Sequence, residues 1–394
     1  MSIEVPAYFD YAATTPLDPQ VARAMSECLL SPKTFGNPSS MSHEYGRSAR
    51  ALVETARAQV AKLIGAQPNC ILWTSGATES NNLALFGLAH YHRDRGKHIV
   101  SARTEHKAVL DPLKQLERAG FEVTYLKPDT QGLVHPEQVA AALRSDTILV
   151  SLMHVNNETG VIQDVGAVGA LCRERAVVLH VDAAQSAGKI PLDVEALNID
   201  ALSLTAHKVY GPKGVGALYL RRKPPLGLQP QIFGGGQEMG LRSGTLATHQ
   251  ILGMGKAFEL AQTLMAADAE RIETLRERLW EGLSALGGIE LNGHPQRRVC
   301  GVLNVAVHDV EGESLQFALR DLALSAGAAC SSGTDESSYV LRALGRSDPL
   351  AQSSLRFSLG RFSTAEEVEF AIATATREIP RLRSLGVPAS NQAH

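Results

Sequence analysis

The sequence predicts an α/β protein with a mainly parallel sheet and a second, smaller α/β domain. Seven apolar, strand-like runs alternate with helical patterns between about residues 70 and 220. One long helical pattern follows, and strand and helix patterns then resume. Runs that are apolar without clean alternation are typical of parallel strands buried on both faces. The chain of 394 residues is also long for a single core, so two domains are expected.

The first domain is expected to contain the seven strands and the helices between them. The strand candidates are 70–76, 97–103, 121–126, 147–155, 177–184, 201–207 and 214–220. The helix candidates between the earlier strands are 79–94, 107–120, 136–144 and 164–175. The last strands follow one another closely, so an antiparallel pair is predicted there. A long helix from Thr245 to about Leu286 is expected to bridge the two domains.

The second domain is predicted from six shorter patterns. Strand-like runs cover 299–307, 322–330 and 353–360, and helical patterns cover 313–322, 338–345 and 365–379. The chain before about Pro16 is expected to join this domain. We therefore place the large domain at residues 16–260 and the small domain at residues 1–15 and 261–394.

Composition narrows the class of protein. A net charge of −3 argues against a general nucleic-acid or membrane surface, and no apolar run is long enough to span a bilayer. The first ten residues lack the pattern of a secretory signal, so we expect a cytoplasmic protein. There is no Cys-x-x-Cys pair and hence no zinc motif. The cysteines expected in apolar cores are Cys28, Cys70, Cys172 and Cys300, whereas Cys330 lies among small and polar residues in "SAGAACSSGT".

Polar residues that suit an active site follow the predicted strands. Lys208 ends an apolar run, where it is either a desolvated nucleophile for an aldehyde cofactor or a lysine that extends past the turn to solvent. Asp182 ends another run, where a carboxylate either keeps a pyridine nitrogen protonated or caps a helix. Gln185 follows three residues later and is placed to hydrogen-bond a ring oxygen.

Three further motifs have similar alternatives. "WTSGATES" predicts a strand, a glycine turn and a helix start near Thr78, which is either an anion site or an ordinary capped helix. His106 either stacks on a flat ring and exchanges protons or is a satisfied core or surface histidine. Asn157 either offers its amide to a ligand or forms a turn.

These motifs are more informative together than singly, because in a parallel sheet the strand ends lie on one side. A planar, phosphorylated, electron-accepting aldehyde, pyridoxal 5′-phosphate, suits the whole set. The set consists of Thr78, His106, Asn157, Asp182, Gln185, His207 and Lys208. In the small domain, Arg356 either binds a substrate carboxylate through two hydrogen bonds or forms a surface salt bridge.

Ten ordered stretches resemble the cysteine desulfurases of the IscS/NifS type, which are pyridoxal-phosphate enzymes of the class V aminotransferase kind with fold type I. They include "YFDYAATTPLDP", "TSGATESNNLA", "MHVNNETG", "VDAAQSAGK", "AHKVYGPKGVGALY", "GGGQEMGLRSGT", "ACSSG" and "SSLRFSLGRF". The resemblance extends from about Tyr8 to Phe362, which is nearly the whole chain.

The resemblance implies a role for each site residue. Lys208 would bind the cofactor as a Schiff base, and Cys330, on a loop at about 327–340, would take the sulfur of L-cysteine as a persulfide. The catalytic set implied is Lys208, Cys330 and His106. The cofactor-binding set implied is Ala77 through its backbone, Thr78, His106, Asn157, Asp182, Gln185, Thr205, His207, Lys208 and Thr245. Asn157 and Arg356 would bind the substrate.

The resemblance also implies partners. Thr245 would reach the phosphate in the partner subunit of a homodimer. The sulfur would pass to acceptor proteins, such as an iron–sulfur scaffold protein, for cluster assembly and for tRNA or cofactor thiolation. We also consider Cys330 as a transient iron–sulfur ligand during cluster assembly. Direct contact with nucleic acid or a membrane is not expected.

The sequence departs from this family in three places. "LTAHK" stands where many relatives have Ser and Gly before His-Lys, although Thr205 keeps a hydroxyl. "TDESSYVLRAL" lacks a proline that is common before Ser-Tyr. The tail after Leu385 is short. The alternatives are a selenocysteine lyase, a transaminase or another class V pyridoxal-phosphate enzyme, and a non-catalytic interaction module that kept the fold.

Overall fold

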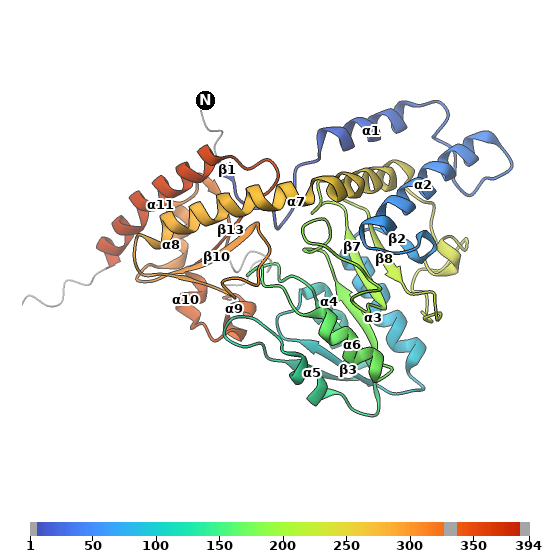
Figure 1. The fold of residues 1–394 in the computed structure, drawn as a ribbon, viewed down its shortest axis with the longest axis horizontal. Helices are drawn as coiled ribbons and strands as arrows, with labels where there is room; N and C mark the ends of the chain where they lie inside the picture. Colours follow the sequence, from blue (N-terminus) through green and yellow to red (C-terminus); the bar gives the residue numbers. More distant parts are fainter. Residues whose placement is uncertain (1–5, 327–336, 387–394) are drawn as a thin grey trace, which may run out of the picture.

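The structure is a computed structural model that describes residues 6–326 and 337–386 of the chain. The described part contains a sheet of seven strands and a sheet of four strands, and a long helix, α7 (Thr248–Ser284), runs past both (Figure 1). The long helix predicted between Thr245 and about Leu286 is therefore confirmed.

The seven-stranded sheet confirms the predicted fold class. Its strands are β2 (Ile71–Thr74), β3 (His98–Ala102), β4 (Glu122–Leu126), β5 (Thr147–Met153), β6 (Val178–Asp182), β7 (Ala201–Thr205) and β8 (Gly216–Leu220). They are arranged in the order β2-β8-β7-β6-β5-β3-β4, and β8 runs antiparallel to both of its neighbours. The remaining pairs are parallel. The antiparallel pair predicted among the last strands is thus β7 with β8, which a short connection can join without a crossover helix.

Helices cover both faces of this sheet, as parallel strands require. One core contains Val53, Val168 and Ile251, from α2 (Glu44–Leu63), α6 (Val165–Glu174) and α7, and α5 (Pro136–Ala142) joins them. On the other face, Leu85 and Leu113 bury the apolar sides of α3 (Ala77–His92) and α4 (Lys107–Arg118). Helix α1 (Pro19–Leu30) packs outside on α7, and two short 3-10 turns, η1 (Pro68–Cys70) and η2 (Glu238–Gly240), lie in the connections.

The four-stranded sheet is built from the C-terminal part of the chain. Its order is β12 (Ser325–Ala326), β13 (Ser354–Ser358), β10 (Val302–Val307) and β9 (Ile289–Leu291), and all its pairs are antiparallel. Beside it, β1 (Ala7–Tyr8) pairs in parallel with β11 (Leu322–Ala323). Phe9 packs edge-on against Phe357, so the first described residues belong to this core. The helices here are α8 (Gly312–Ala318), α9 (Tyr339–Ala343), α10 (Asp348–Gln352) and α11 (Ala365–Gly386).

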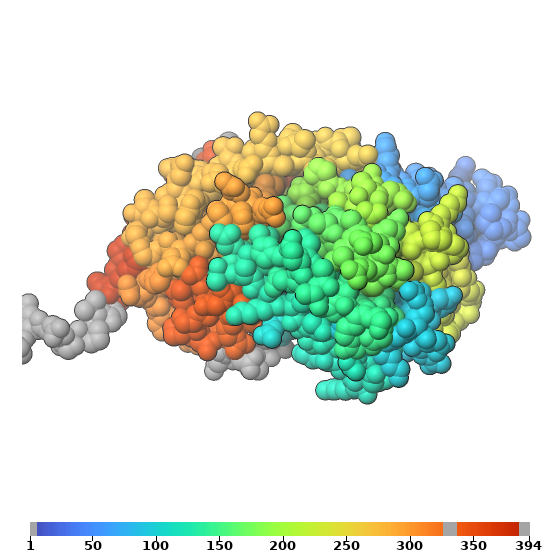
Figure 2. Space-filling view, turned by 60° about the horizontal axis from the view of Figure 1, so that its bottom comes forward, coloured from blue at the N-terminus to red at the C-terminus, as the bar shows by residue number. Residues whose placement is uncertain are grey.

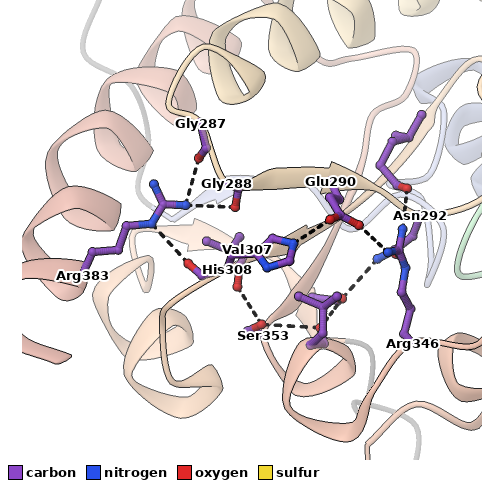
Figure 3. Close-up of polar contacts among 12 residues, drawn as sticks. Gly287, Gly288, Glu290, Asn292, Val307, His308, Arg346, Ser353 and Arg383 are labelled. Atoms are coloured by element: carbon purple, nitrogen blue, oxygen red, sulfur yellow. Dashed lines mark hydrogen bonds and ion pairs between the residues drawn. The ribbon is translucent and has the colours of Figure 1, made fainter. Parts of the chain in front are cut away.

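The outer edge of the four-stranded sheet is held by polar contacts (Figure 3). Glu290 on β9 pairs with His308 at 2.8 Å and also with Arg346. Arg383 from α11 donates to the carbonyls of Gly287 and Gly288, both at 2.9 Å, just after α7 ends. In the space-filling view, this part of the chain (orange to red) lies directly beside the elements of the larger sheet (Figure 2).

The cysteines confirm most of the core prediction. Cys28, Cys70 and Cys172 are buried, whereas Cys300 is only partly buried and lines a small cavity. Cys330 lies outside the described residues. Within residues 6–326 and 337–386, no helix has the length and apolar character needed to cross a membrane.

Candidate active site

Most of the predicted site residues meet in one cavity of about 630 Å³. They reach it from the carboxyl ends of β2, β3, β5, β6 and β7, and from β13 of the smaller sheet. The predicted residues that line it are Ala77, Thr78, His106, Asn157, Asp182, Gln185, Thr205, His207, Lys208 and Arg356. The convergence expected from parallel strand ends is therefore present.

Asp182 ends β6 and is 5% exposed. One carboxylate oxygen accepts from Nδ2 of Asn81 at 2.7 Å, and the other accepts from the backbone N–H of Ala184 at 2.9 Å. Both donors are uncharged, so they hold the carboxylate in place without neutralising it. Asp182 thus presents a fixed negative charge at the base of the cavity, which suits a protonated ring nitrogen.

His106 precedes α4 and serves as its N-cap. Its Nδ1 accepts from the backbone N–H of Ala108 at 3.0 Å, which leaves Nε2 available to the cavity. Burial lowers the pKa of His106; Asp182 raises this pKa and Lys208 lowers it further. The imidazole is therefore neutral near pH 7 and presents its Nε2–H toward a ligand, as a flat stacking group or a proton donor requires.

Lys208 and His207 follow directly after β7. Nδ1 of His207 lies 3.1 Å from Oγ1 of Thr14, and the His207 carbonyl accepts from Thr15. Burial lowers the pKa of His207 to about 4, helped by the positive charge of Lys208. His207 therefore stays neutral, so it adds no further positive charge beside the Lys208 amine.

The start of α3 forms an anion-binding corner of the cavity. Its N-cap is Gly76, which supplies no side chain, so the N–H groups at the helix start face the cavity together with the Thr78 hydroxyl. Glu79 also lines this corner, where its carboxylate accepts from the backbone N–H of Ser75 at 2.8 Å and is neutralised by an ion pair with Arg242 at 2.8 Å. Free N–H groups and the helix dipole favour a phosphate group at this position.

Arg356 brings the smaller sheet into the cavity. Its Nη1 donates to the carbonyl of Asn157 and its Nη2 to Asp10 Oδ1, both at 2.7 Å. Its Nε is buried and has no partner among the described residues, and the same holds for Asn157 Oδ1. A positively charged fork held at the cavity wall suits a ligand carboxylate.

Two residues that hold this site together were not predicted from the sequence. Asp10 orients Arg356, and Asn81 orients Asp182. Both lie inside quoted motifs, "YFDYAATT" and "ESNNLA", but neither follows a strand of the large sheet. The expectation that site residues follow strand ends therefore gave no signal for them, and their role is seen only in their contacts with Arg356 and Asp182.

One predicted residue that the structure describes does not line this cavity. Thr245 lines a separate surface hollow with Phe35 and His249. Cys330 lies outside the described residues, although Ser325, the first residue of β12, lines the cavity. Among the described residues, no group of His, Cys, Asp or Glu is arranged to hold a metal ion.

The cavity suits pyridoxal phosphate on its own geometry. Three buried polar atoms have no hydrogen-bond partner among the described residues: Thr205 Oγ1, Asn157 Oδ1 and Arg356 Nε. Because buried polar atoms are normally hydrogen-bonded, these atoms suit a polar ligand. An anion corner, a lysine and a carboxylate stand around the same space. These are the groups that a phosphorylated pyridine aldehyde requires.

Comparisons with known proteins agree with this geometry. Residues 7–370 match the family described as Aminotransferase class-V. The chain is 58% identical to a cysteine desulfurase IscS of Aeromonas hydrophila over 97% of this chain and 95% of that protein. The chain belongs to the class V aminotransferase family, among its IscS/NifS-type cysteine desulfurases. This desulfurase is accordingly a pyridoxal-phosphate enzyme.

Solved structures agree with the fold of this desulfurase. A NifS-like protein superposes with a TM-score of 0.88 at 36% identity, covering 95% of this chain and 100% of the other. A structure described as SspA in complex with cysteine gives a TM-score of 0.81 at 37% identity, covering 91% of this chain and all of the other. The alternative of a selenocysteine lyase or another class V enzyme is not favoured by these relatives.

Proposed function

We propose that this cysteine desulfurase removes sulfur from L-cysteine in the cavity around Lys208 and transfers it to Cys330. The observation that carries the proposal is the meeting of Lys208, Asp182 and Arg356 in one cavity. Overall, L-cysteine and the Cys330 thiol give L-alanine and a Cys330 persulfide: one C–S bond breaks and one S–S bond forms. No external oxidant or reductant is needed for this step.

Pyridoxal phosphate, when bound, supplies a ring that accepts electrons from the substrate. Lys208 is the residue to bind it and, once freed by the incoming amine, to move the proton at the substrate Cα. Asp182 favours a protonated ring nitrogen through its fixed charge. The anion corner with Ala77, Thr78, Thr205 and His207 holds the phosphate.

His106 and Arg356 act on the substrate. Arg356 is placed to bind the carboxylate of L-cysteine, with Asn157 beside it, and so fixes which bonds of the substrate face the ring. The Nε2–H of His106 exchanges protons with the substrate thiol or the leaving group. A Cys330 thiolate then attacks the substrate sulfur.

The partner assignments are part of the same proposal. Thr245, on the surface of this chain, reaches the phosphate site of a second copy in a homodimer. The exposed side chains of Phe35 and Phe233, 74% and 77% exposed, support such an interface. The persulfide passes to sulfur-acceptor proteins in the cytoplasm, such as an iron–sulfur scaffold protein, with Cys330 as a transient ligand of the nascent cluster.

We also retain the two-domain division, with residues 16–260 as the large domain and 1–15 with 261–394 as the small one. The pairing of β1 with β11 supports the assignment of the first residues to the C-terminal part. The small domain carries the cysteine loop, at about 327–340.

Two variants test the proposal. Cys330→Ala should keep the visible absorbance of bound pyridoxal phosphate but lose persulfide formation and sulfide release from L-cysteine. Lys208→Ala should lose the visible absorbance that marks covalent attachment of the cofactor. Sulfide release at the wild-type rate from the Cys330 variant would overturn the sulfur route, and an unchanged cofactor spectrum would overturn the role of Lys208.

A further inference from the structure

A second lysine, Lys189, lies behind the cofactor site. It follows β6 seven residues after Asp182, and it does not line the main cavity. It lines a separate cavity of about 40 Å³, too small for a substrate, and Ala12 lines both cavities. Lys189 therefore does not contact a ligand in the main cavity directly. Its charge acts through space on Lys208, Arg356 and His207, and its hydrogen bonding reaches the site through another residue.

That residue is Gln185, whose side-chain amide is held at both ends. Nζ of Lys189 donates to Gln185 Oε1 at 2.7 Å, and Gln185 Nε2 donates to the carbonyl of Ala12 at 2.7 Å. A flipped amide would place an N–H group against the ammonium and an oxygen against a carbonyl. Because both contacts would then be repulsive, the amide has one orientation, with its second Nε2–H left for the cavity.

From these contacts we infer that Lys189 is a positioning residue that locks Gln185 as a hydrogen-bond donor to the phenolic oxygen of bound pyridoxal phosphate. When Lys189 is protonated, its charge also polarises the amide, so the donated hydrogen bond is stronger than that of an isolated glutamine. This inference rests on the proposed place of Gln185 in the cofactor site.

The surroundings of Lys189 favour this role over an ordinary ion pair. Asp268 lines the same small cavity but pairs with Arg361 at 2.8 Å. The charged and titratable groups that act on Lys189 are Lys208, Cys300 and Arg356, and Tyr11 and Tyr210 line its cavity. Burial is the main cause that lowers the pKa of Lys189 to about 7, and the charges of Lys208 and Arg356 lower it further.

The consequence is measurable on the cofactor itself. The positive charge of Lys189 acts on the phenolic oxygen through the polarised amide of Gln185, and it opposes protonation of the bound cofactor. Removing that charge should therefore raise the pH midpoint of the cofactor's visible absorbance change. Because the charge acts through one intervening amide, we expect a rise of about half a unit to one unit.

The experiment titrates the absorbance of the loaded enzyme in Lys189→Met, Lys189→Arg and Lys256→Met. The methionine variant at position 189 should raise the midpoint, and the arginine variant should restore it toward the wild-type value. Lys256→Met is the matched control, since this lysine is partly exposed on α7 and pairs with Glu259, and it should leave the midpoint unchanged. Lys189→Gln repeats the test if the methionine variant does not fold.

A double variant separates positioning from a general structural effect. In a Gln185→Leu background, Lys189→Met should give a much smaller shift, because the hydrogen bond through Gln185 is already absent and only the through-space effect of the Lys189 charge remains. An unshifted midpoint in Lys189→Met, or an equal shift with and without Gln185, would overturn the inference. If the wild-type protein bound no pyridoxal phosphate, the proposed function itself would fail, so the two failures are distinguishable.

Discussion

The two sheets contribute to the active site in different ways. The seven-stranded sheet delivers its residues at successive strand ends. Asp182 and His106 are held by residues of the helices that pack on this sheet, and His207 is held by Thr14. The four-stranded sheet delivers Arg356 from within a strand, and its position depends on Asp10 and Asn157, both distant in sequence. In the proposed function, the first arrangement places the groups that bind the cofactor, and the second joins two parts of the molecule at the substrate.

The strongest test of this contrast is Asp182→Asn. Asparagine keeps the shape, and the partnerless Oδ1 of Asn81 can turn to face the new amide, so folding should be preserved. Loss of the charge should lower kcat for L-cysteine by about 10²–10³-fold. The check is steady-state kinetics of the loaded enzyme, with the thermal midpoint as control. A kcat within a few-fold of wild type would remove Asp182 from the mechanism.

Arg356→Met should have a smaller effect that falls mainly on binding. Loss of a charge-assisted pair with the substrate carboxylate should raise KM for L-cysteine by about 10- to 100-fold. Arg356→Lys keeps the charge but not the two-pronged geometry, so its KM should lie between those of the methionine variant and wild type. A KM unaffected by either substitution would show that the smaller sheet does not bind the substrate.

Glu158 lies between β5 and α6 and contacts the C-terminal part of the chain. The pH dependence of stability that it causes therefore tests the contact between the large-sheet and small-sheet parts of the molecule. Its Oε2 accepts from Ser338 at 2.5 Å, just before α9, and burial raises the pKa of Glu158 to about 7. Between about pH 4.5 and 7 the folded state thus binds more protons than the unfolded state, so stability falls as pH rises through this window and levels off above it. Glu158→Gln removes this pH-dependent contribution to the unfolding free energy.

The measurement for Glu158 is urea unfolding of wild type and Glu158→Gln at pH 5 and pH 8. Relative to the variant, wild type should lose about 1–3 kcal/mol of unfolding free energy between these two pH values. The amide keeps an oxygen for Ser338, so the difference reports the proton rather than the hydrogen bond. Parallel pH profiles for the two proteins would contradict the raised pKa.

The smallest effect is expected at the outer edge of the four-stranded sheet. Glu290→Gln removes the charge that pairs with Arg346 and His308, but the Glu290 side chain is 47% exposed. We expect a loss of no more than about 1 kcal/mol in unfolding free energy, and a still smaller loss in high salt. A loss above about 2 kcal/mol would mean that this edge is as tightly coupled as the cavity wall.

Much of the fold and of the cofactor site could be predicted because both follow from parallel strands. Buried apolar runs show where each strand ends, and the ends share one side, so Asp182, His106 and Lys208 could be grouped without coordinates. Asp10, Asn81 and Lys189 could not be found in this way. Their roles depend on contacts across the molecule, such as Asn81 with Asp182, 101 residues apart, and local patterns do not encode such pairs.

Helix α7 has a consequence for how the protein unfolds. Ile251 and Phe258 are buried in the core of the large sheet, and Ile272 and Leu279 are buried in the core of the smaller one. If either core melted, half of the single 37-residue helix would lose its packing partner. The two cores should therefore melt in one cooperative transition, although each has its own sheet.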